Sequence, residues 1–217
     1  MTALPIVIIG GGGHAKVLLS VLLDLNLNVL GFTDQNPQDS YLSKLAIPYL
    51  GDDDSLLKYV KTEILLVNGL GSIKSTAGRA SVFQKSTQLN FQFATLIHPS
   101  AIIARDCTIE MGAQIMAGAI VQTGSRIGAN TIVNTGARVD HDCDIGRHVH
   151  ISPGAILSGQ VCVEDRAHVG TGAVVIQGIR IGSSSVVGAG AVVIRDVKQN
   201  AVVVGVPAIQ KGTVLSQ

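Results

Sequence analysis

Aromatic residues are scarce in this chain, and tryptophan is absent. Only 3% of the 217 residues are aromatic, whereas 47% are hydrophobic. A core of this composition has to be filled by aliphatic and small side chains rather than by large aromatic anchors. The sequence therefore favours regular ladders of Ile, Val and Ala over a conventional mixed core.

Strong net charge and long apolar runs are missing as well. The net charge is +1 and no basic block occurs, so we expect no nucleic-acid partner. No apolar run approaches the roughly 20 residues that span a bilayer, so we expect no membrane insertion. The start of the chain, Met1 to Gly13, lacks a basic region, and no signal peptide is predicted.

Cysteine is also rare. The three cysteines, Cys107, Cys143 and Cys162, are odd in number and lack metal-ligand spacing. Free cysteines of this kind are usually small buried packing residues. We therefore predict a reduced, cytoplasmic protein without a bound metal.

What the chain does contain is a six-residue repeat between residues 97 and 198. Four residues after each block opening stands a small or β-branched residue, from Ala101 to Val197. A short fixed period is typical of a solenoid, whose units bury their apolar faces by stacking on their neighbours. Seventeen consecutive blocks open on an aliphatic residue: Ile97, Ile103, Ile109, Ile115, Val121, Ile127, Val133, Val139, Ile145, Ile151, Leu157, Val163, Val169, Val175, Ile181, Val187 and Val193.

Three blocks can close a triangular coil of about 18 residues, each block holding a short strand and a corner. Residues one coil apart, such as Ile97, Ile115 and Val133, then form columns with the ~4.8 Å spacing of paired strands. Burial of each Ile or Val contributes roughly 1.5–3 kcal/mol. The repeat resembles the left-handed parallel β-helix of the hexapeptide-repeat acyltransferases, and only that resemblance implies its hand, because the usual crossover rule favours a right-handed one.

A strand, a glycine turn and a helix open the chain. Pro5–Ile9 is a predicted buried strand, Gly10–Lys16 is the turn, and Val17–Leu25 has helical periodicity. Glycines let backbone N–H groups approach an anion, and the start of a helix favours negative charge. A second predicted strand, Asn28–Thr33, ends at Asp34, where a carboxylate can accept a hydrogen bond from a ribose hydroxyl.

The turn also fits G-x-G-x-x-G/A through Gly10, Gly12 and Ala15, although a turn that only packs a helix on a sheet is the alternative. Further predicted elements are a short edge strand at 47–50, a short helix ending at Val60, strands at 63–68 and 91–96, and a helix at 75–88. About 95 residues provide one nucleotide half-site, which favours a sugar-linked nucleotide over NAD. The predicted fold class is α/β plus β-solenoid: a small Rossmann-like βαβ domain in residues 1–96, a left-handed parallel β-helix in 97–198 and a C-terminal tail in 199–217.

Three segments together carry a family resemblance. They are GGGGHAKV at Gly10–Val17, FTD at Phe32–Asp34 and VGVPA at Val204–Ala208. With the hexads, they resemble the bacterial sugar O- and N-acyltransferases, which include the sialic acid O-acetyltransferases, the perosamine N-acetyltransferases and the UDP-4-amino-sugar N-acetyltransferases of the PglD type.

The resemblance implies a nucleotide-sugar on the first domain, with Gly12, Gly13 and His14 near the diphosphate and Asp34 near the nucleoside. It further implies acetyl-CoA on the solenoid, in a groove between the subunits of a homotrimer. Outward aliphatic residues would need covering in an isolated prism: Ile120, Ile132 and Ile156.

One of the six histidines differs from the others. A lone histidine in a solenoid is usually solvated, and this is our expectation for His98, His148 and His168. His141 instead lies between Asp140 and Asp142, at a hexad position that should project from a corner. A carboxylate that orients an imidazole makes it a suitable general base for an amine or hydroxyl that attacks a thioester.

The segment Asn134–Cys143 also resembles the stretch that holds the family's catalytic histidine. The resemblance implies that His141 is the base and Asp142 its partner, with Asp140 and Asp144 as alternatives. It places His150 and Asn134 near the acetyl-CoA thioester. Pantetheine contacts are implied for three further residues: Gly159, Thr171 and Ala189. By period, His150 and His168 should stack on adjacent coils, outside the prism.

The favoured function is an acetyl-CoA-dependent N-acetyltransferase acting on the 4-amino group of a nucleotide-linked amino-sugar. VDHDC and GVPA most resemble the UDP-sugar branch. A sugar O-acetyltransferase of the sialic acid type is the nearest alternative. A trimeric β-helix carbonic anhydrase, with zinc on three histidines, has no use for the glycine-rich domain and lacks the expected ligand spacing. A non-catalytic sugar-nucleotide sensor would not need His141 beside a carboxylate.

Overall fold

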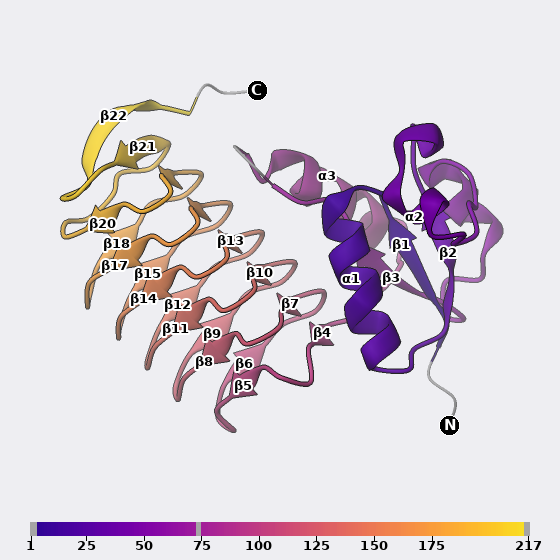
Figure 1. The fold of residues 1–217 in the computed structure, drawn as a ribbon, viewed down its shortest axis with the longest axis horizontal. Helices are drawn as coiled ribbons and strands as arrows, with labels where there is room; N and C mark the ends of the chain where they lie inside the picture. The colour runs from indigo at the N-terminus through magenta and orange to yellow at the C-terminus, as the bar shows by residue number, and fades with distance from the viewer. Residues whose placement is uncertain (1–3, 73–74, 215–217) are drawn as a thin grey trace.

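The structure, a computed structural model, describes residues 4–72 and 75–214. A small α/β domain lies beside a stack of coils (Figure 1). Within the described part of the chain, no helix is long and apolar enough to cross a membrane.

A three-stranded parallel sheet, in the order β2-β1-β3, forms the centre of the first domain. On the central strand, Ile6 and Ile8 pack with α1, whereas Val7 and Ile9 face the cluster around Phe83 of α3. The two helices therefore cover opposite faces of the sheet, as the alternation of side chains along a strand requires. The elements are β1 (Ile6–Ile9), α1 (Gly13–Asp24), β2 (Val29–Thr33), the 3-10 turn η1 (Pro37–Asp39), α2 (Tyr41–Lys44), the 3-10 turn η2 (Asp53–Lys58), β3 (Leu65–Asn68) and α3 (Ala77–Gln88).

Two strands predicted for this domain are wrong. The segments at 47–50 and 91–95 each contribute one isolated bridge to the sheet, Phe32 with Tyr49 and Leu66 with Phe93, and Leu96 opens the first strand of the solenoid, β4 (Leu96–Ile97). The predicted helix to Val60 is the 3-10 turn η2, and α3 begins at Ala77 rather than at residue 75. The apolar pattern thus identified segments that touch the sheet but could not show how many ladder hydrogen bonds they form.

The predicted solenoid is confirmed as a left-handed parallel β-helix with three faces. Strands one coil apart pair in register, for example Ile132 with His150 and Val133 with Ile151. The strands are β4 (Leu96–Ile97), β5 (Ile102–Ile103), β6 (Thr108–Ile109), β7 (Gln114–Ile115), β8 (Ile120–Val121), β9 (Arg126–Ile127), β10 (Ile132–Val133), β11 (Arg138–Val139), β12 (Asp144–Ile145), β13 (His150–Ile151), β14 (Ile156–Leu157), β15 (Cys162–Val163), β16 (His168–Val169), β17 (Val174–Val175), β18 (Arg180–Ile181), β19 (Val186–Val187) and β20 (Val192–Val193).

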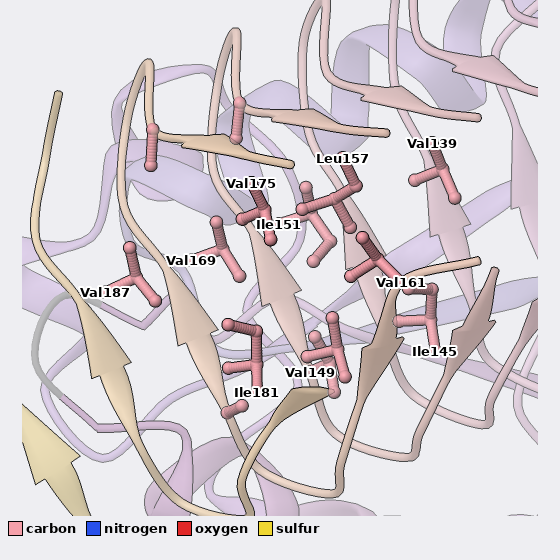
Figure 2. Close-up of a cluster of buried hydrophobic side chains, with 14 of the residues drawn as sticks. Val139, Ile145, Val149, Ile151, Leu157, Val161, Val169, Val175, Ile181 and Val187 are labelled. Carbon is pink, nitrogen blue, oxygen red and sulfur yellow. The ribbon is translucent and has the colours of Figure 1, made fainter. Parts of the chain in front are cut away.

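Aliphatic columns fill the interior of the prism. Ile151, Val169 and Val187 point inward from successive coils of one face (Figure 2), and none is exposed. At the open first coil, Ile97 is 39% exposed, because no earlier coil covers it. At the other end, β21 (Ala201–Val204) pairs in parallel with β19. The last strand, β22 (Ile209–Thr213), pairs antiparallel with β21 and closes the stack.

The three faces are named here by their sheets. Every third strand of the solenoid belongs to the same face. The eight-stranded face contains β4, β7, β10, β13, β16, β19, β21 and β22. The six-stranded face contains β5, β8, β11, β14, β17 and β20, and the five-stranded face contains β6, β9, β12, β15 and β18. The first domain packs on the eight-stranded face, where Leu96, Met116 and Ile132 join the cluster beneath α1. Ile132 is fully buried there, so the chain's own first domain covers this residue, whereas Ile120 and Ile156 stay partly exposed on the six-stranded face.

Candidate active site

A cavity of about 460 Å³ opens at the carboxyl ends of β1, β2 and β3. Its lining includes the four residues predicted to hold a nucleotide-sugar: Gly12, Gly13, His14 and Asp34. This edge is where ligands of parallel α/β sheets bind. The structure therefore brings the predicted substrate residues together around one opening.

The glycines of the turn have two different roles. A Cβ at Gly10, whose φ is +85°, would collide with Leu70, and one at Gly11 would collide with Ser40, so both positions serve close packing. A Cβ at Gly12 or Gly13 would meet nothing within 4 Å. The backbone at the start of α1 is therefore open toward the cavity, as an anion site at a helix N-terminus requires.

Two carboxylates mark the end of the cavity beside β2. Asp34 accepts backbone N–H groups of Gly11 at 2.7 Å and of Asn36 at 2.8 Å, one on each oxygen. It therefore orders the glycine turn, and a ribose hydroxyl would have to share an oxygen already in use. Asp53, which accepts from Thr33 Oγ1 at 2.7 Å, also lines the cavity. From the sequence, this segment was predicted only as part of the short helix that ends at Val60.

His14 joins the first domain to the solenoid. Its Nε2 lies 2.8 Å from Gln114 Oε1, and Gln114 Nε2 donates to Asn68 O at 2.9 Å. This orientation of the amide assigns the proton to His14 Nε2 and leaves Nδ1 unprotonated. Burial, followed by the charge of Arg79, lowers the pKa of His14 to about 4. A neutral histidine at this position supplies hydrogen bonding but no positive charge.

His150 is held between the two domains. Its Nδ1 hydrogen-bonds Ser72 Oγ, and its Nε2 accepts from Asn134 Nδ2 at 3.0 Å. Asn134 Oδ1 accepts from Thr135 N at 2.8 Å, which fixes the amide with its nitrogen toward the imidazole. Burial, followed by His168, lowers the pKa of His150 to about 3. The ring is therefore neutral, with its proton on Nδ1.

The predicted stacking of His150 and His168 outside the prism is confirmed, with ring centroids 5.1 Å apart. The expectation of solvated histidines is wrong, however. His148 and His168 are 6% and 8% exposed, and His148 packs edge-on against Phe83 of α3. His98 is half-buried and pairs with Asp24 at 3.3 Å. The hexad position fixed the direction of each side chain but not what the first domain would cover.

His141 projects from the edge between the six- and five-stranded faces, and its side chain is 43% exposed. Asp142 Oδ2 lies 2.9 Å from its Nδ1. Asp140 accepts the backbone N–H of His141 instead, and Asp144 pairs with Arg126. The hydrogen bond to Asp142, followed by its charge and that of Asp140, raises the pKa of His141 against slight burial. Nε2 is left as the basic nitrogen.

Gly159 lies one coil above His141, and a Cβ at this position would overlap the imidazole ring. The glycine therefore gives the ring its place on the edge. Sequence reasoning assigned Gly159 to the cofactor and missed this contact. The 18-residue separation of the two positions could have revealed it.

The predicted catalytic and cofactor residues fall on two different edges of the prism. His141, Asp142 and Gly159 lie between the six- and five-stranded faces, whereas Asn134, Thr171 and Ala189 lie between the eight- and six-stranded faces. Thr171 and Ala189 share one exposed column. The two edges are separated by one block, up to about 20 Å of extended chain. A single chain therefore does not gather both sets around one reacting atom.

The cavity and the His141 edge lie on opposite sides of the prism. The first domain covers the eight-stranded face, and in a triangular cross-section that face is opposite the edge that carries His141. Within the described ranges, no group of three His, Cys, Asp or Glu side chains could hold a metal ion. The nitrogens of His150 hydrogen-bond Ser72 and Asn134 instead, so the zinc alternative has no ligand set there.

Comparison with known proteins adds to this geometry. Residues 5–85 match the family model described as the PglD N-terminal domain. A histidine-to-asparagine variant of perosamine N-acetyltransferase from Caulobacter crescentus, in complex with CoA and GDP-perosamine, is 37% identical and has a TM-score of 0.89, with 96% of this chain and 97% of that one covered. The acetyltransferase domain of PglB from Neisseria gonorrhoeae, in complex with acetyl coenzyme A, is 33% identical, with a TM-score of 0.88 and coverages of 95% and 98%.

Proposed function

Because the chain belongs to the PglD-type sugar acyltransferases, we propose that it is an acetyl-CoA-dependent N-acetyltransferase of the 4-amino group of a nucleotide-linked sugar. The observation that carries the proposal is the exposed His141–Asp142 pair, with Nδ1 bound to the carboxylate at 2.9 Å and Nε2 available. An imidazole held in this way is suited to take a proton from an attacking amine. The GDP-perosamine and CoA bound to the Caulobacter relative support the substrate class.

The chemistry assigns His141 as general base. The sugar amine attacks the carbonyl carbon of acetyl-CoA, and Nε2 takes the proton that the nitrogen loses. The tetrahedral intermediate then expels CoA thiolate and leaves the N-acetyl sugar. Asp142 holds the ring and stabilises the imidazolium that forms, as an orienting carboxylate does in other histidine bases.

Acetyl-CoA would lie along the edge that carries Asn134, Thr171 and Ala189, with His150 near the thioester. Thr171 and Ala189 are exposed, so pantetheine could run along the backbone of their column. On the first domain, Gly12, Gly13 and His14 would face the diphosphate and Asp34 the nucleoside.

We propose a homotrimer in which each active site combines two chains. A sugar held in the cavity of one chain lies on the far side of that prism from its own His141. The His141 of another copy is therefore the base within reach. The six-stranded face supports contact between copies because its outward column is largely aliphatic: Ile102, Ile120, Arg138, Ile156, Val174 and Val192.

The five-stranded face suits solvent instead. Arg126 pairs there with Glu110 at 2.6 Å and with Asp144 at 2.8 Å, and Arg180 pairs with Glu164 at 2.7 Å. Exposed ion pairs of this kind contribute little to stability but keep a surface polar.

The carboxylates of the cavity need a donor on the base. Asp34 and Asp53 only accept hydrogen bonds when ionised; uracil, thymine and guanine offer a ring N–H, and adenine and cytosine offer an exocyclic amino group. The motifs favour UDP, and the Caulobacter relative binds GDP-perosamine, so the screen below includes both.

Thiol release from acetyl-CoA with UDP-, GDP- and dTDP-linked 4-amino-sugars tests the function. We expect turnover with one nucleotide class and no turnover with the matching 4-hydroxy sugar. His141→Ala should lower the turnover rate by about 10²-fold or more. Turnover of the hydroxy sugar alone would make the protein an O-acetyltransferase. Thiol release that His141→Ala leaves unchanged would remove His141 from the reaction.

A further inference from the structure

Arg79 is a buried cation beside the cavity. Its side chain, on the first turn of α3, is 1% exposed. Nη1 donates to Asn68 O at 2.8 Å and Leu70 O at 2.9 Å, and Nε donates to Asn130 O at 3.2 Å. Nη2 is buried and has no hydrogen-bond partner among residues 4–72 and 75–214. Three carbonyls thus hold the guanidinium and leave one nitrogen unused.

No anion balances this charge in the described part of the chain. None of the ion pairs found there includes Arg79. The titratable groups that feel its charge are His14, His148 and His150, and burial keeps all three neutral. Burial also lowers the pKa of Arg79, to about 9, and the group is still cationic at neutral pH. An unpaired buried charge is costly to a fold, which points to an anion that arrives with a ligand.

Arg79 lies at the correct end of the cavity for such an anion. It is the one Lys or Arg among the described lining residues, whereas the acidic lining residues Asp34 and Asp53 follow β2. It holds the carbonyls on either side of Gly69, and Gly69 N donates to Ile9 O at 2.8 Å. The loop after β3 therefore sits beside the open glycine turn, with the guanidinium next to it.

We infer that Arg79 is the counter-charge for the diphosphate of the bound nucleotide-sugar. The inference rests on the proposed function for the class of ligand. The field of the buried guanidinium and its unused Nη2 donor both favour an anion at the glycine turn. Arg79 is thus a specificity residue that makes the cavity select a nucleotide with phosphates over a bare nucleoside.

The test compares ligands that differ only in phosphate. Affinities of guanosine, GMP and GDP, and of uridine, UMP and UDP, are measured by calorimetry for wild type, Arg79→Gln and Arg79→Lys. We expect Arg79→Gln to reduce the ratio of diphosphate to nucleoside affinity by about 10- to 100-fold, the range of a charge-assisted hydrogen bond. Nucleoside affinity should stay unchanged, and Arg79→Lys should keep part of the ratio. Arg126→Gln removes an equal charge from the five-stranded face and should change nothing.

If a folded Arg79→Gln variant lost equal affinity for nucleoside and diphosphate, Arg79 would have only a structural role and the inference would be overturned. An unchanged ratio of diphosphate to nucleoside affinity would overturn it as well. If the variant does not fold, the Nε–H NMR signal of Arg79 in ¹⁵N-labelled wild type decides: it should shift with GDP or UDP and not with the nucleoside, and equal shifts would refute the role. If no nucleoside diphosphate binds wild type, the proposed function itself fails.

Discussion

Subunit complementation tests the division of the site between chains. His141→Ala removes the base and leaves the cavity intact. Gly12→Trp places an indole in the cavity: residue 12 has φ −77°, which any residue adopts, and a Cβ there meets nothing within 4 Å. Each variant alone should be inactive. If the cavity of one chain works with His141 of another, mixed oligomers contain intact sites. Each such site combines the open cavity of a His141→Ala chain with the His141 side chain of a Gly12→Trp chain.

The expected magnitude follows from counting. In an equal, randomly assembled mixture, about half of the sites have an intact cavity and about half of those have an intact base, so activity returns to about one quarter of wild type in a closed symmetric ring. Co-expression with two affinity tags and thiol release measure this value. A mixture of His141→Ala with His141→Asn is the matched control and should stay inactive. Complementation no greater than that control would show that cavity and base belong to the same chain.

Three further predictions concern single side chains. Asp142→Asn removes the group that raises the pKa of the His141 imidazole. The acidic limb of the plot of kcat/KM against pH should therefore move to lower pH, and kcat should fall about 10- to 100-fold. An acidic limb that does not move would contradict the pairing of His141 with Asp142. Gly159→Ala should displace that imidazole and lower kcat with Tm nearly unchanged, and a wild-type kcat would show that the ring has room. Burial keeps His14, His148 and His150 neutral, so the unfolded chain alone gains their protons below about pH 6.5, and the free energy of unfolding should fall by about 4 kcal/mol in total between pH 7 and pH 5.5 because of these three. Urea unfolding at these two pH values measures the fall, which His148→Asn should reduce by about one third. An unchanged fall in this variant would mean that His148 titrates in the folded state.

The solenoid could be predicted because every residue of a column meets the same surroundings. Ile151 and Val169 occupy equivalent positions one coil apart, so each repeat is an independent instance of one pattern. The first domain offered no such repetition. The apolar segment around Tyr49 is typical of a short strand but makes only one bridge, and apolar composition does not reveal how much of an edge is paired.

In the candidate site, contacts between residues close in sequence could be predicted, and contacts between distant residues could not. The contact between His141 and Asp142 joins adjacent residues, and local spacing is sufficient to predict it. The contact between His14 and Gln114 joins residues 100 apart, and that between His150 and Ser72 joins residues 78 apart. Both depend on how the first domain docks on the eight-stranded face, which no periodicity encodes.

Coil spacing also limits which side chains can do chemistry on a prism edge. Equivalent residues of adjacent coils are about 4.8 Å apart, so a ring that turns along the stack toward the next coil takes the space of the Cβ there. At the His141 edge the next coil contributes Gly159, and the ring occupies the space that a side chain would fill. A ring in the orientation of His141 therefore needs a glycine eighteen residues along. With any side chain at residue 159 the imidazole would have to leave this position, so the arrangement of the proposed base depends on the next coil as well as on Asp142.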